Sequence, residues 1–550
     1  MDEQRAWWKE AVVYQIYPKS FADSDGDGIG DIQGVIDHLD YVASLGVDVI
    51  WLNPVYESPQ ADNGYDIGDY RAIHEAYGTM ADWEELLGAV HDRDMRLVMD
   101  LVVNHTSTVH EWFQQSRREN DDYGDYYIWR EGEEPPNNWA SGFGGPAWEY
   151  DEAAGKQYLH LFDETQADLN WDNEDVREDV YEMMNWWLEK GIDGFRMDVI
   201  NMVSKPDGLP DGDPDSGWVG IDQFANGPDT VEYLSEMAES TYDDYDTMTV
   251  GECVDVDPET ASDYVSDEGP MDMLFHFEHM FVDADDGWLS PAEWDLTDLK
   301  AVISKWQTEL DGWNSLYLTN HDQPRIVSRF GDDGEYRRES GKLLGTLLFT
   351  LSGTPYVYQG QEIGMTNYPW SSLDELDDLQ SIGKVREAIE AGEIDEFDDV
   401  QQAVRDRSRD NARTPMQWDD SENAGFTDGD PWLAVNPDHE TVNVAAAEAD
   451  EASILHYYRT LVELRETHEE LIYGAYNLLL PDHESVWAYR MELDGDAVLV
   501  TLNVDDSETT VAIEDAARTT DLLLSNYDAP ADTEATLTLR PYEARVYELE

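Results

Sequence analysis

The chain has 550 residues, enough for one large domain with attachments or for about three ordinary domains. Hydrophobic residues make up 41% and aromatic residues 11%, which is typical of a packed globular protein and excludes a disordered one. The 123 acidic and 33 basic residues give a net charge of −90 with no basic stripe, so we expect no nucleic-acid partner.

Short apolar, strand-like runs recur along the first two thirds of the chain, separated by helical patterns. They span 12–18, 47–54, 96–105, 191–200, 247–253, 273–279, 315–322 and 354–364. Apolar strands that alternate with helices are covered on both faces, as in a parallel sheet. The pattern therefore predicts an α/β fold, a (β/α)8 TIM barrel.

Two connections are too long for plain barrel loops. Residues 106–170, after the third strand, are rich in Trp, Tyr, Gly and Asn and predict an inserted subdomain between the barrel segments 1–105 and 171–472. A second, acidic excursion covers about 365–412. From 473 to 550 the sequence changes to alternating apolar and polar runs, which predict a C-terminal antiparallel β-domain.

The loop after the first strand carries carboxylates at alternate positions with glycines between them. This spacing can wrap oxygen ligands around a hard cation, Ca²⁺ ahead of Mg²⁺. Position twelve of the loop is Gly34 instead of a bidentate glutamate, so the loop is not an EF-hand, and a solvated acidic turn remains the alternative. The candidate ligands are Asp23, Asp25, Asp27, the Ile29 carbonyl and Asp31.

The fourth strand carries an arginine and an aspartate two residues apart, Arg196 and Asp198. Residues two apart in a strand point to the same side, and a neighbouring guanidinium favours the ionised carboxylate. Asp198 is therefore a candidate nucleophile. The alternative is an aspartate that caps the next helix and pairs with Arg196.

Polar residues gather at the carboxyl ends of four predicted strands, where barrel enzymes place their working groups. They are Asn104, His105, Arg196, Asp198, Glu252, His321 and Asp322. A set dominated by carboxylates, without Cys/His metal spacing, a phosphate-cradling loop or a serine elbow, indicates glycoside chemistry. That chemistry needs an ionised carboxylate and a protonated one, roughly 5–5.5 Å apart for retention. Glu252 follows an apolar strand without a basic neighbour in sequence, so it is the candidate acid, and Asp322 is a third carboxylate for the transition state.

Four motifs at these strand ends indicate a family. They are Asp100-Leu-Val-Val-Asn-His105, Gly194-Phe-Arg-Met-Asp-Val199, Gly251-Glu252 and Leu318-Thr-Asn-His-Asp322, supported by segments 60–66, 166–170 and 408–418. The sequence resembles the α-amylase family of glycoside hydrolases, and within it the oligo-1,6-glucosidase and α-glucosidase branch. The resemblance covers nearly the whole chain and the order of its motifs.

The resemblance implies a role for each matching residue. Asp198 would be the nucleophile, Glu252 the general acid/base and Asp322 the transition-state stabiliser. The residues implied to hold the sugar in the −1 site are His105, Arg196, His321 and, stacked beneath the ring, Tyr65. The loop of Asp23 to Asp31 matches the cation site of the branch.

Asp62 and Arg409 match the pair that binds the non-reducing end and closes the pocket, which implies exo action on short substrates. Spacing favours Arg409 over the nearby Arg413. In this branch a valine directly after the nucleophile is associated with α-1,6 bonds, so Val199 favours α-1,6 cleavage with α-1,4 as the second choice. The segment 251–256 departs from the usual oligo-1,6-glucosidase continuation and leaves the linkage open.

We therefore expect a retaining, exo-acting α-glucosidase that acts on small α-glucosides without an organic cofactor. A transglucosidase or a sucrose- or maltose-isomerising relative is the alternative within the family. A non-catalytic carbohydrate-binding protein, or a relative of the transporter heavy chains, is a distant second class. Those heavy chains carry a membrane helix and lack the catalytic acids, whereas this sequence has all three acids and no apolar run near the ~20 residues of a span.

The charge and the cysteine content indicate the surroundings of the protein. A diffuse charge of −90 repels itself at ordinary ionic strength, whereas at about 1 M salt the screening length falls to about 3 Å. A halophilic, salt-rich cytoplasm is therefore expected, with a cationic partner as the alternative. The single cysteine, Cys253, and the lack of a signal-peptide pattern also favour the cytoplasm.

Overall fold

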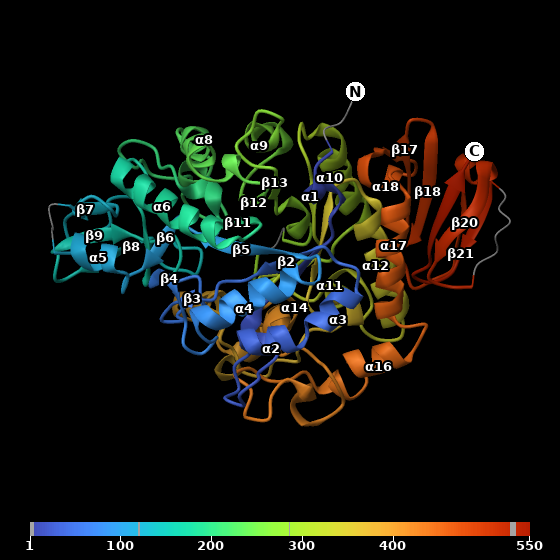
Figure 1. The fold of residues 1–550 in the computed structure, drawn as a ribbon, viewed down its shortest axis with the longest axis horizontal. Coiled ribbons are helices and arrows are strands. Elements are labelled where there is room, and N and C mark those ends of the chain that lie inside the picture. The colour runs from blue at the N-terminus through green and yellow to red at the C-terminus, as the bar shows by residue number, and fades with distance from the viewer. Residues whose placement is uncertain (1–4, 119–121, 285–286, 529–534) are drawn as a thin grey trace.

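The computed structural model describes residues 5–118, 122–284, 287–528 and 535–550 (Figure 1). Its largest sheet has eight parallel strands in the order β13-β12-β11-β5-β2-β1-β15-β14. An additional parallel bridge between Leu274 and Asn314 joins the two ends, so the sheet closes and the predicted barrel is confirmed. The strands are β1 Val13–Ile16, β2 Val49–Leu52, β5 Arg96–Val102, β11 Gly194–Asp198, β12 Met248–Glu252, β13 Met273–Phe275, β14 Ser315–Leu316 and β15 Thr354–Tyr358.

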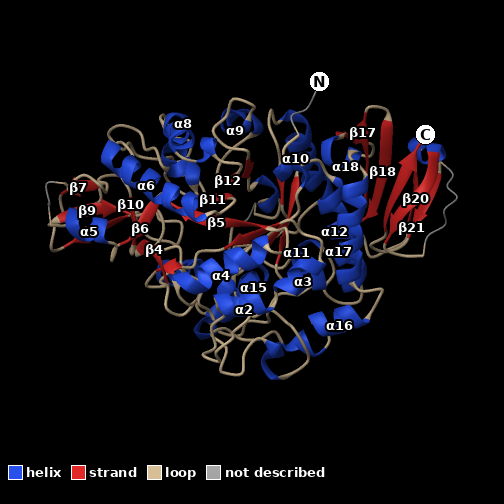
Figure 2. Ribbon diagram, in the orientation of Figure 1, coloured by secondary structure: helices blue, strands red, loops and turns tan. Residues whose placement is uncertain are grey.

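Helices occupy the connections between these strands (Figure 2). The first ten are α1 Trp7–Glu10, α2 Ile32–Asp37, α3 Leu39–Ser44, α4 Met80–His91, α5 Glu111–Ser116, α6 Glu174–Lys190, α7 Ile221–Phe224, α8 Thr230–Ser240, α9 Pro258–Val265 and α10 Leu296–Glu309. The other eight are α11 Ile326–Phe330, α12 Arg337–Thr350, α13 Leu379–Ala391, α14 Gln401–Arg407, α15 Asp410–Arg413, α16 Val444–Ala449, α17 Ile454–Thr467 and α18 Glu470–Tyr473. None of these helices, within the described ranges, is both long and apolar enough to cross a bilayer.

Local sequence explains where the helix before the catalytic strand starts and stops. Asn173 caps α6 by accepting a hydrogen bond from the Asp175 amide, and Gly191 ends it in the left-handed region, at φ 98°. α6 buries one apolar face. The chain then continues from Gly191 into β11, which is buried along its whole length.

The segment after β5 forms a separate lobe at one end of the long axis (Figure 1). Its strands are β6 His105–Ser107, β7 Trp129–Glu131, β8 Trp148–Asp151, β9 Lys156–Leu159 and β10 Gln166–Asp168. β6 pairs antiparallel with β10, so this lobe leaves and rejoins the barrel through one two-stranded ribbon. A second small ribbon, β3 Tyr56–Glu57 with β4 Asp69–Ile73, precedes it in the chain.

The C-terminal region forms an antiparallel sheet at the opposite end (Figure 1). It comprises the sheet β16-β17-β18-β22-β20 and the ribbon β19-β21. The strands are β16 Ala475–Leu478, β17 Val486–Leu493, β18 Asp496–Asn503, β19 Thr509–Ala512, β20 Thr519–Ser525, β21 Thr536–Leu539 and β22 Ala544–Leu549.

This sheet packs on both faces. Trp487, Tyr489 and Val500 belong to the same apolar core as the barrel, whereas Val486 and Leu499 belong to a second core under the ribbon. The ammonium of Lys300, on α10, is buried and donates to the carbonyls of Leu480, His483 and Val486.

All eight barrel strands are shorter than the runs predicted for them, as three examples show. The strand expected over 96–105 ends at Val102, and His105 opens β6 instead. The strand expected over 315–322 ends at Leu316, and the next carbonyl, of Tyr317, accepts from the His279 imidazole at 2.9 Å. The strand expected over 354–364 ends at Tyr358, since Gly360 turns the chain with φ 86°.

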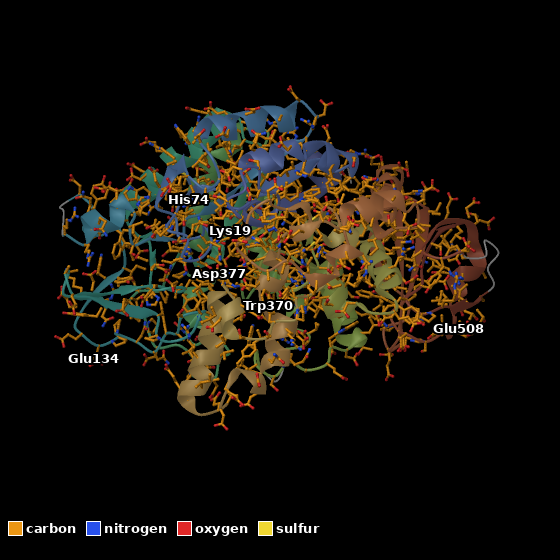
Figure 3. All side chains as sticks on the ribbon, turned by 90° about the horizontal axis from the view of Figure 1, so that it is seen from below. Lys19, His74, Glu134, Trp370, Asp377 and Glu508 are labelled. Carbon is orange, nitrogen blue, oxygen red and sulfur yellow. The ribbon has the colours of Figure 1, made fainter. Side chains whose placement is uncertain are left out.

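Carboxylates cover the molecule along its long axis. Exposed acids reach from Glu134 in the inserted lobe to Glu508 in the C-terminal domain, at opposite ends of Figure 3. The charge is therefore diffuse, as the sequence indicates.

Candidate active site

A cavity of ≈ 1320 Å³ opens at the carboxyl ends of the barrel strands. Eight of the ten predicted catalytic and substrate-binding residues line it: Asp62, Tyr65, His105, Asp198, Val199, Glu252, Asp322 and Arg409. The other two, Arg196 and His321, are fully buried and contact the lining residues. The structure thus gathers all ten at one mouth of the barrel.

Arg196 lies beneath the cavity and contacts three carboxylates. Its Nη1 donates to Asp198 Oδ1 at 2.7 Å and to Asp100 Oδ1 at 2.9 Å. Its Nη2 donates to Glu252 Oε2. Because strands β5, β11 and β12 are adjacent in the barrel, their ends bring these four side chains together. The sequence predicted an ion pair of Arg196 with Asp198 alone, whereas in the structure Arg196 also donates to Glu252.

The surroundings of these carboxyl groups favour one retained proton. Burial raises the pKa of Asp198 well above its ordinary value, against the opposing charge of Arg196, and the charge of Glu252 raises it further. Burial also raises the pKa of Glu252, again opposed by Arg196. One guanidinium among three carboxylates leaves an excess of negative charge, which favours one proton on the pair of Asp198 and Glu252. A proton and an anion at one site are what acid-assisted displacement needs.

Val199 adopts a backbone conformation that is unusual for its type. It has φ 36° and ψ 41°, in the left-handed region, which a β-branched residue rarely enters. Its amide points to Glu252 Oε2 at 3.4 Å, and its side chain lines the cavity. The turn directly after Asp198 therefore places both the Val199 side chain and the Glu252 carboxylate.

Asp322 is held as an anion by the charges around it. Arg413 Nη2 donates to its Oδ1 at 2.5 Å and Arg409 Nη1 at 3.4 Å. Burial raises the pKa of this carboxyl, but His321, Arg409 and Arg413 together bring the pKa well below its usual range.

The two histidines are neutral around pH 7. Burial lowers the pKa of His105 to about 4 and that of His321 to about 3. The Gln15 amide donates to His321 Nδ1 at 2.9 Å, which places the ring proton on Nε2, 3.3 Å from Asp322. The ring of Tyr65 stacks on His321 with centroids 5.2 Å apart, and its hydroxyl donates to Asp100 Oδ2 at 2.9 Å.

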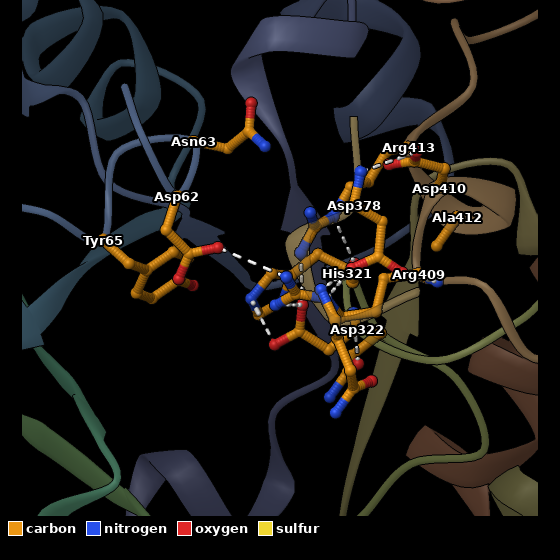
Figure 4. A network of polar contacts seen from close by, with 12 residues as sticks. Asp62, Asn63, Tyr65, His321, Asp322, Asp378, Arg409, Asp410, Ala412 and Arg413 are labelled. Atoms are coloured by element: carbon orange, nitrogen blue, oxygen red, sulfur yellow. Dashed lines mark hydrogen bonds and ion pairs between the residues drawn. The ribbon is translucent and has the colours of Figure 1, made fainter. Parts of the chain in front are cut away.

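An ion pair crosses the mouth of the cavity (Figure 4). Arg409 Nη2 donates to Asp62 Oδ1 at 3.3 Å, and Gln166 Nε2 donates to Asp62 Oδ2 at 3.2 Å. The contact with Asp62 comes from Arg409, while Arg413 donates to Asp322 and to the His321 carbonyl.

The acidic loop after β1 brings three of its four aspartates together. Ligand oxygens of Asp23, Asp25 and Asp27 all lie within 4.8 Å of one another. Asp31 lies outside this group: its carboxylate caps α2 through the Gly34 amide and accepts from the amide and hydroxyl of Ser24. Three clustered carboxylates with glycines between them fit a hard cation.

Several contributors could not be assigned from the sequence. Asp100 was recognised within a motif without a role, and Gln166 within a supporting segment. Asp378 had no signal at all, although its carboxylate accepts from Arg409 Nε at 2.7 Å. The contact joins residues 31 apart in sequence, so no short motif contains it.

Comparison with known proteins agrees with this geometry. Residues 15–474 match the family model "Alpha amylase, catalytic domain", and residues 486–546 match "Alpha-amylase SusG C-terminal domain". The chain is 52% identical to an oligo-1,6-glucosidase of Parageobacillus thermoglucosidasius over 99% of both chains, and 45% identical to a trehalose-6-phosphate hydrolase of Bacillus subtilis, over 100% of this chain and 99% of that one. The crystal structure of an isomaltulose synthase from Klebsiella sp. LX3 superposes with a TM-score of 0.96 at 42% identity, covering 100% of both chains. This chain belongs to the α-amylase family of glycoside hydrolases.

Proposed function

We propose that this protein is a retaining, exo-acting α-glucosidase that hydrolyses the non-reducing terminal α-glucosidic bond of short oligosaccharides. The observation that carries the proposal is the single guanidinium of Arg196 bound to both Asp198 and Glu252 under the cavity. Two carboxyl groups that hold one proton supply a nucleophile and an acid in one place.

The reaction then follows in two balanced steps. The Asp198 carboxylate attacks the anomeric carbon while the Glu252 carboxyl gives its proton to the leaving oxygen, and the glycosidic bond breaks. Water next attacks the glycosyl–enzyme ester, Glu252 takes its proton, and the Asp198 carboxylate is released. Asp322, held as an anion, stabilises the positive charge that develops on the sugar ring in both steps.

Exo action on short substrates is supported by the ion pair across the mouth. Asp62 and Arg409 both line the cavity and contact each other, so the pair would close the end of the cavity that Tyr65 also lines. A terminal glucose would fill that end, and its hydroxyls would meet the two charged groups.

We propose that α-1,6 bonds are favoured, with α-1,4 bonds also accepted. Val199 lines the cavity, and its amide points to Glu252 Oε2 at 3.4 Å, so its side chain would lie near the bond to be cut. The relative at 52% identity is named an oligo-1,6-glucosidase, which points the same way.

A transglucosidase or sucrose-isomerising activity is the second candidate. It is favoured by the TM-score of 0.96 to an isomaltulose synthase. Product analysis separates the two activities: with concentrated isomaltose, maltose and sucrose, hydrolysis gives free glucose, whereas transfer gives mainly new disaccharides. An Asp198→Ala variant should be inactive in either case, and an inactive parent protein would overturn both proposals.

We propose a structural Ca²⁺, or Mg²⁺, in the loop after β1. Asp23, Asp25 and Asp27 supply clustered oxygens, with the Ile29 carbonyl as a further ligand. Asp31 would contribute by capping α2 rather than as a direct ligand.

We also propose that the protein works in the salt-rich cytoplasm of a halophile. The net charge of −90 and its spread over the surface support this setting, because salt screens the repulsion. The single, buried Cys253 fits a reducing compartment.

A further inference from the structure

The buried carboxylate of Asp378 meets two parts of the chain at once (Figure 4). It is the N-cap of α13, where Oδ1 accepts from the Gln380 amide at 3.0 Å. The same Oδ1 accepts from Arg409 Nε at 2.7 Å, and Oδ2 accepts from the Arg409 amide at 3.1 Å. A helix cap and an arginine anchor therefore share one side chain.

This anchor determines where the rest of the Arg409 guanidinium points. With Nε fixed on Asp378, Nη1 and Nη2 face Asp322 and Asp62, at 3.4 and 3.3 Å. Both of those contacts are long, whereas the bond to Asp378 is short and fully buried. The ring of Phe143 covers the guanidinium, with its centroid 4.7 Å from Cζ. Asp378 thus supplies the firmest side-chain contact of Arg409.

The helix that Asp378 caps is also part of the cavity. Gln380, Lys384 and Ala388, on successive turns of α13, line it together with Asp62 and Arg409. From behind, Asp410 Oδ2 accepts from the amides of Asp377 and Asp378 at 2.7 and 2.9 Å and holds the cap in place. The orientation of Arg409 and the position of this wall are therefore set by the same residue.

We propose that Asp378 is a positioning residue of the active site: by fixing Arg409 Nε it aims one guanidinium at both Asp62 and Asp322, and it ties the α13 wall to the sugar-binding end. Asp378 is fully buried and is not among the residues that line the cavity, so it acts through Arg409. The inference rests on the proposed function, because its readout is α-glucoside cleavage.

The first test is a double-mutant cycle with Asp378→Asn and Arg409→Ala. Loss of a charge-assisted hydrogen bond predicts that Asp378→Asn lowers kcat/KM for isomaltose by about ten- to a hundredfold. If Asp378 acts through Arg409, the double variant is no slower than Arg409→Ala alone. Unchanged kcat/KM in folded Asp378→Asn, or additive losses in the cycle, would overturn the proposal.

Two further variants separate positioning from stability. Asp378→Ser keeps an oxygen that can cap α13 but cannot reach Arg409, so it should keep the helix cap and a melting temperature close to that of Asp378→Asn while kcat/KM stays low. Full activity in Asp378→Ser would show that the residue is only a helix cap. Glu543→Gln is the matched control, because Glu543 is equally buried and bonds Arg540 and Arg545 in the C-terminal domain. It should lower the melting temperature without changing kcat/KM.

The same experiment distinguishes the two levels of inference. A parent protein that cleaves no α-glucoside refutes the proposed function itself. A parent that cleaves isomaltose, beside an Asp378→Asn variant that cleaves it equally fast, refutes only the role of Asp378.

Discussion

The charge of Arg196 should determine the pH of the acidic limb of kcat/KM, and the variant Arg196→Gln tests this prediction. The variant removes a buried cation that contacts Asp198 at 2.7 Å and Asp100 at 2.9 Å, together with Glu252. For charge centres about 4 Å apart and an effective dielectric constant of about 20, each pair contributes about 4 kcal/mol, or about 3 pKa units at most.

The sign of the effect follows from the protonation state that reacts. Arg196 favours the ionised form of Asp198, so its loss raises the pKa of Asp198 further. Since the ionised form attacks, the acidic limb of kcat/KM should move to higher pH, with about a tenfold loss of activity for each unit below the new limb. Removal of the buried cation also costs about 3–5 kcal/mol of stability, so the melting temperature should fall.

The assay is kcat/KM for p-nitrophenyl α-glucoside from about pH 5 to about pH 9. Arg196→Lys is the control, because it restores the charge without the two-pronged geometry. It should return the acidic limb towards that of the parent while the maximum rate stays low. A folded, slow Arg196→Gln variant whose acidic limb coincides with that of the parent would refute the reasoning.

Three other predictions address the metal, the salt and the linkage. Chelation by EDTA should lower the melting temperature, because a bound ion at 100 times its Kd adds about 2.7 kcal/mol to the free energy of unfolding. The shift should vanish in Asp25→Asn, and no shift in the parent would favour a solvated turn. Transfer from about 3 M to about 0.1 M KCl should lower both stability and activity, because the screening length grows to about 10 Å, and an unchanged melting temperature would contradict the halophilic setting. Val199→Ala should reduce the ratio of kcat/KM for isomaltose to kcat/KM for maltose by about tenfold, because the smaller side chain fills less of the cavity beside Glu252. A constant ratio would assign the linkage preference to another residue.

The barrel could be predicted because its strands are short, apolar and buried on both faces. Each apolar run, such as 247–253, predicts a strand by itself, and the order in which the strands pair follows from the parallel topology. The strand ends could not be predicted as well. The chain stays apolar through Leu318 after the ladder has ended at Leu316, because those side chains still pack into the core without strand pairing.

The candidate site divides in the same way. Arg196, Asp198 and Glu252 lie at the ends of neighbouring strands, so topology alone brings them together. Contacts that depend on loop paths stay hidden: Asp378 bonding Arg409, and Asp31 turning to cap α2 instead of joining Asp23. Each is decided by a side-chain direction that one sequence does not encode in any short pattern.

The way the C-terminal sheet is seated limits how the chain can be rearranged. The sheet shares its core with the barrel through Trp487 and Tyr489, and the Lys300 ammonium finds its acceptors in the first turn of that domain. Truncation before residue 475 would expose the apolar surface of the barrel that this sheet covers and would remove the Leu480, His483 and Val486 carbonyls that accept from Lys300. The domain is thus not a cassette that can be exchanged between relatives: a graft would have to carry α10 and the 480–486 turn as one unit.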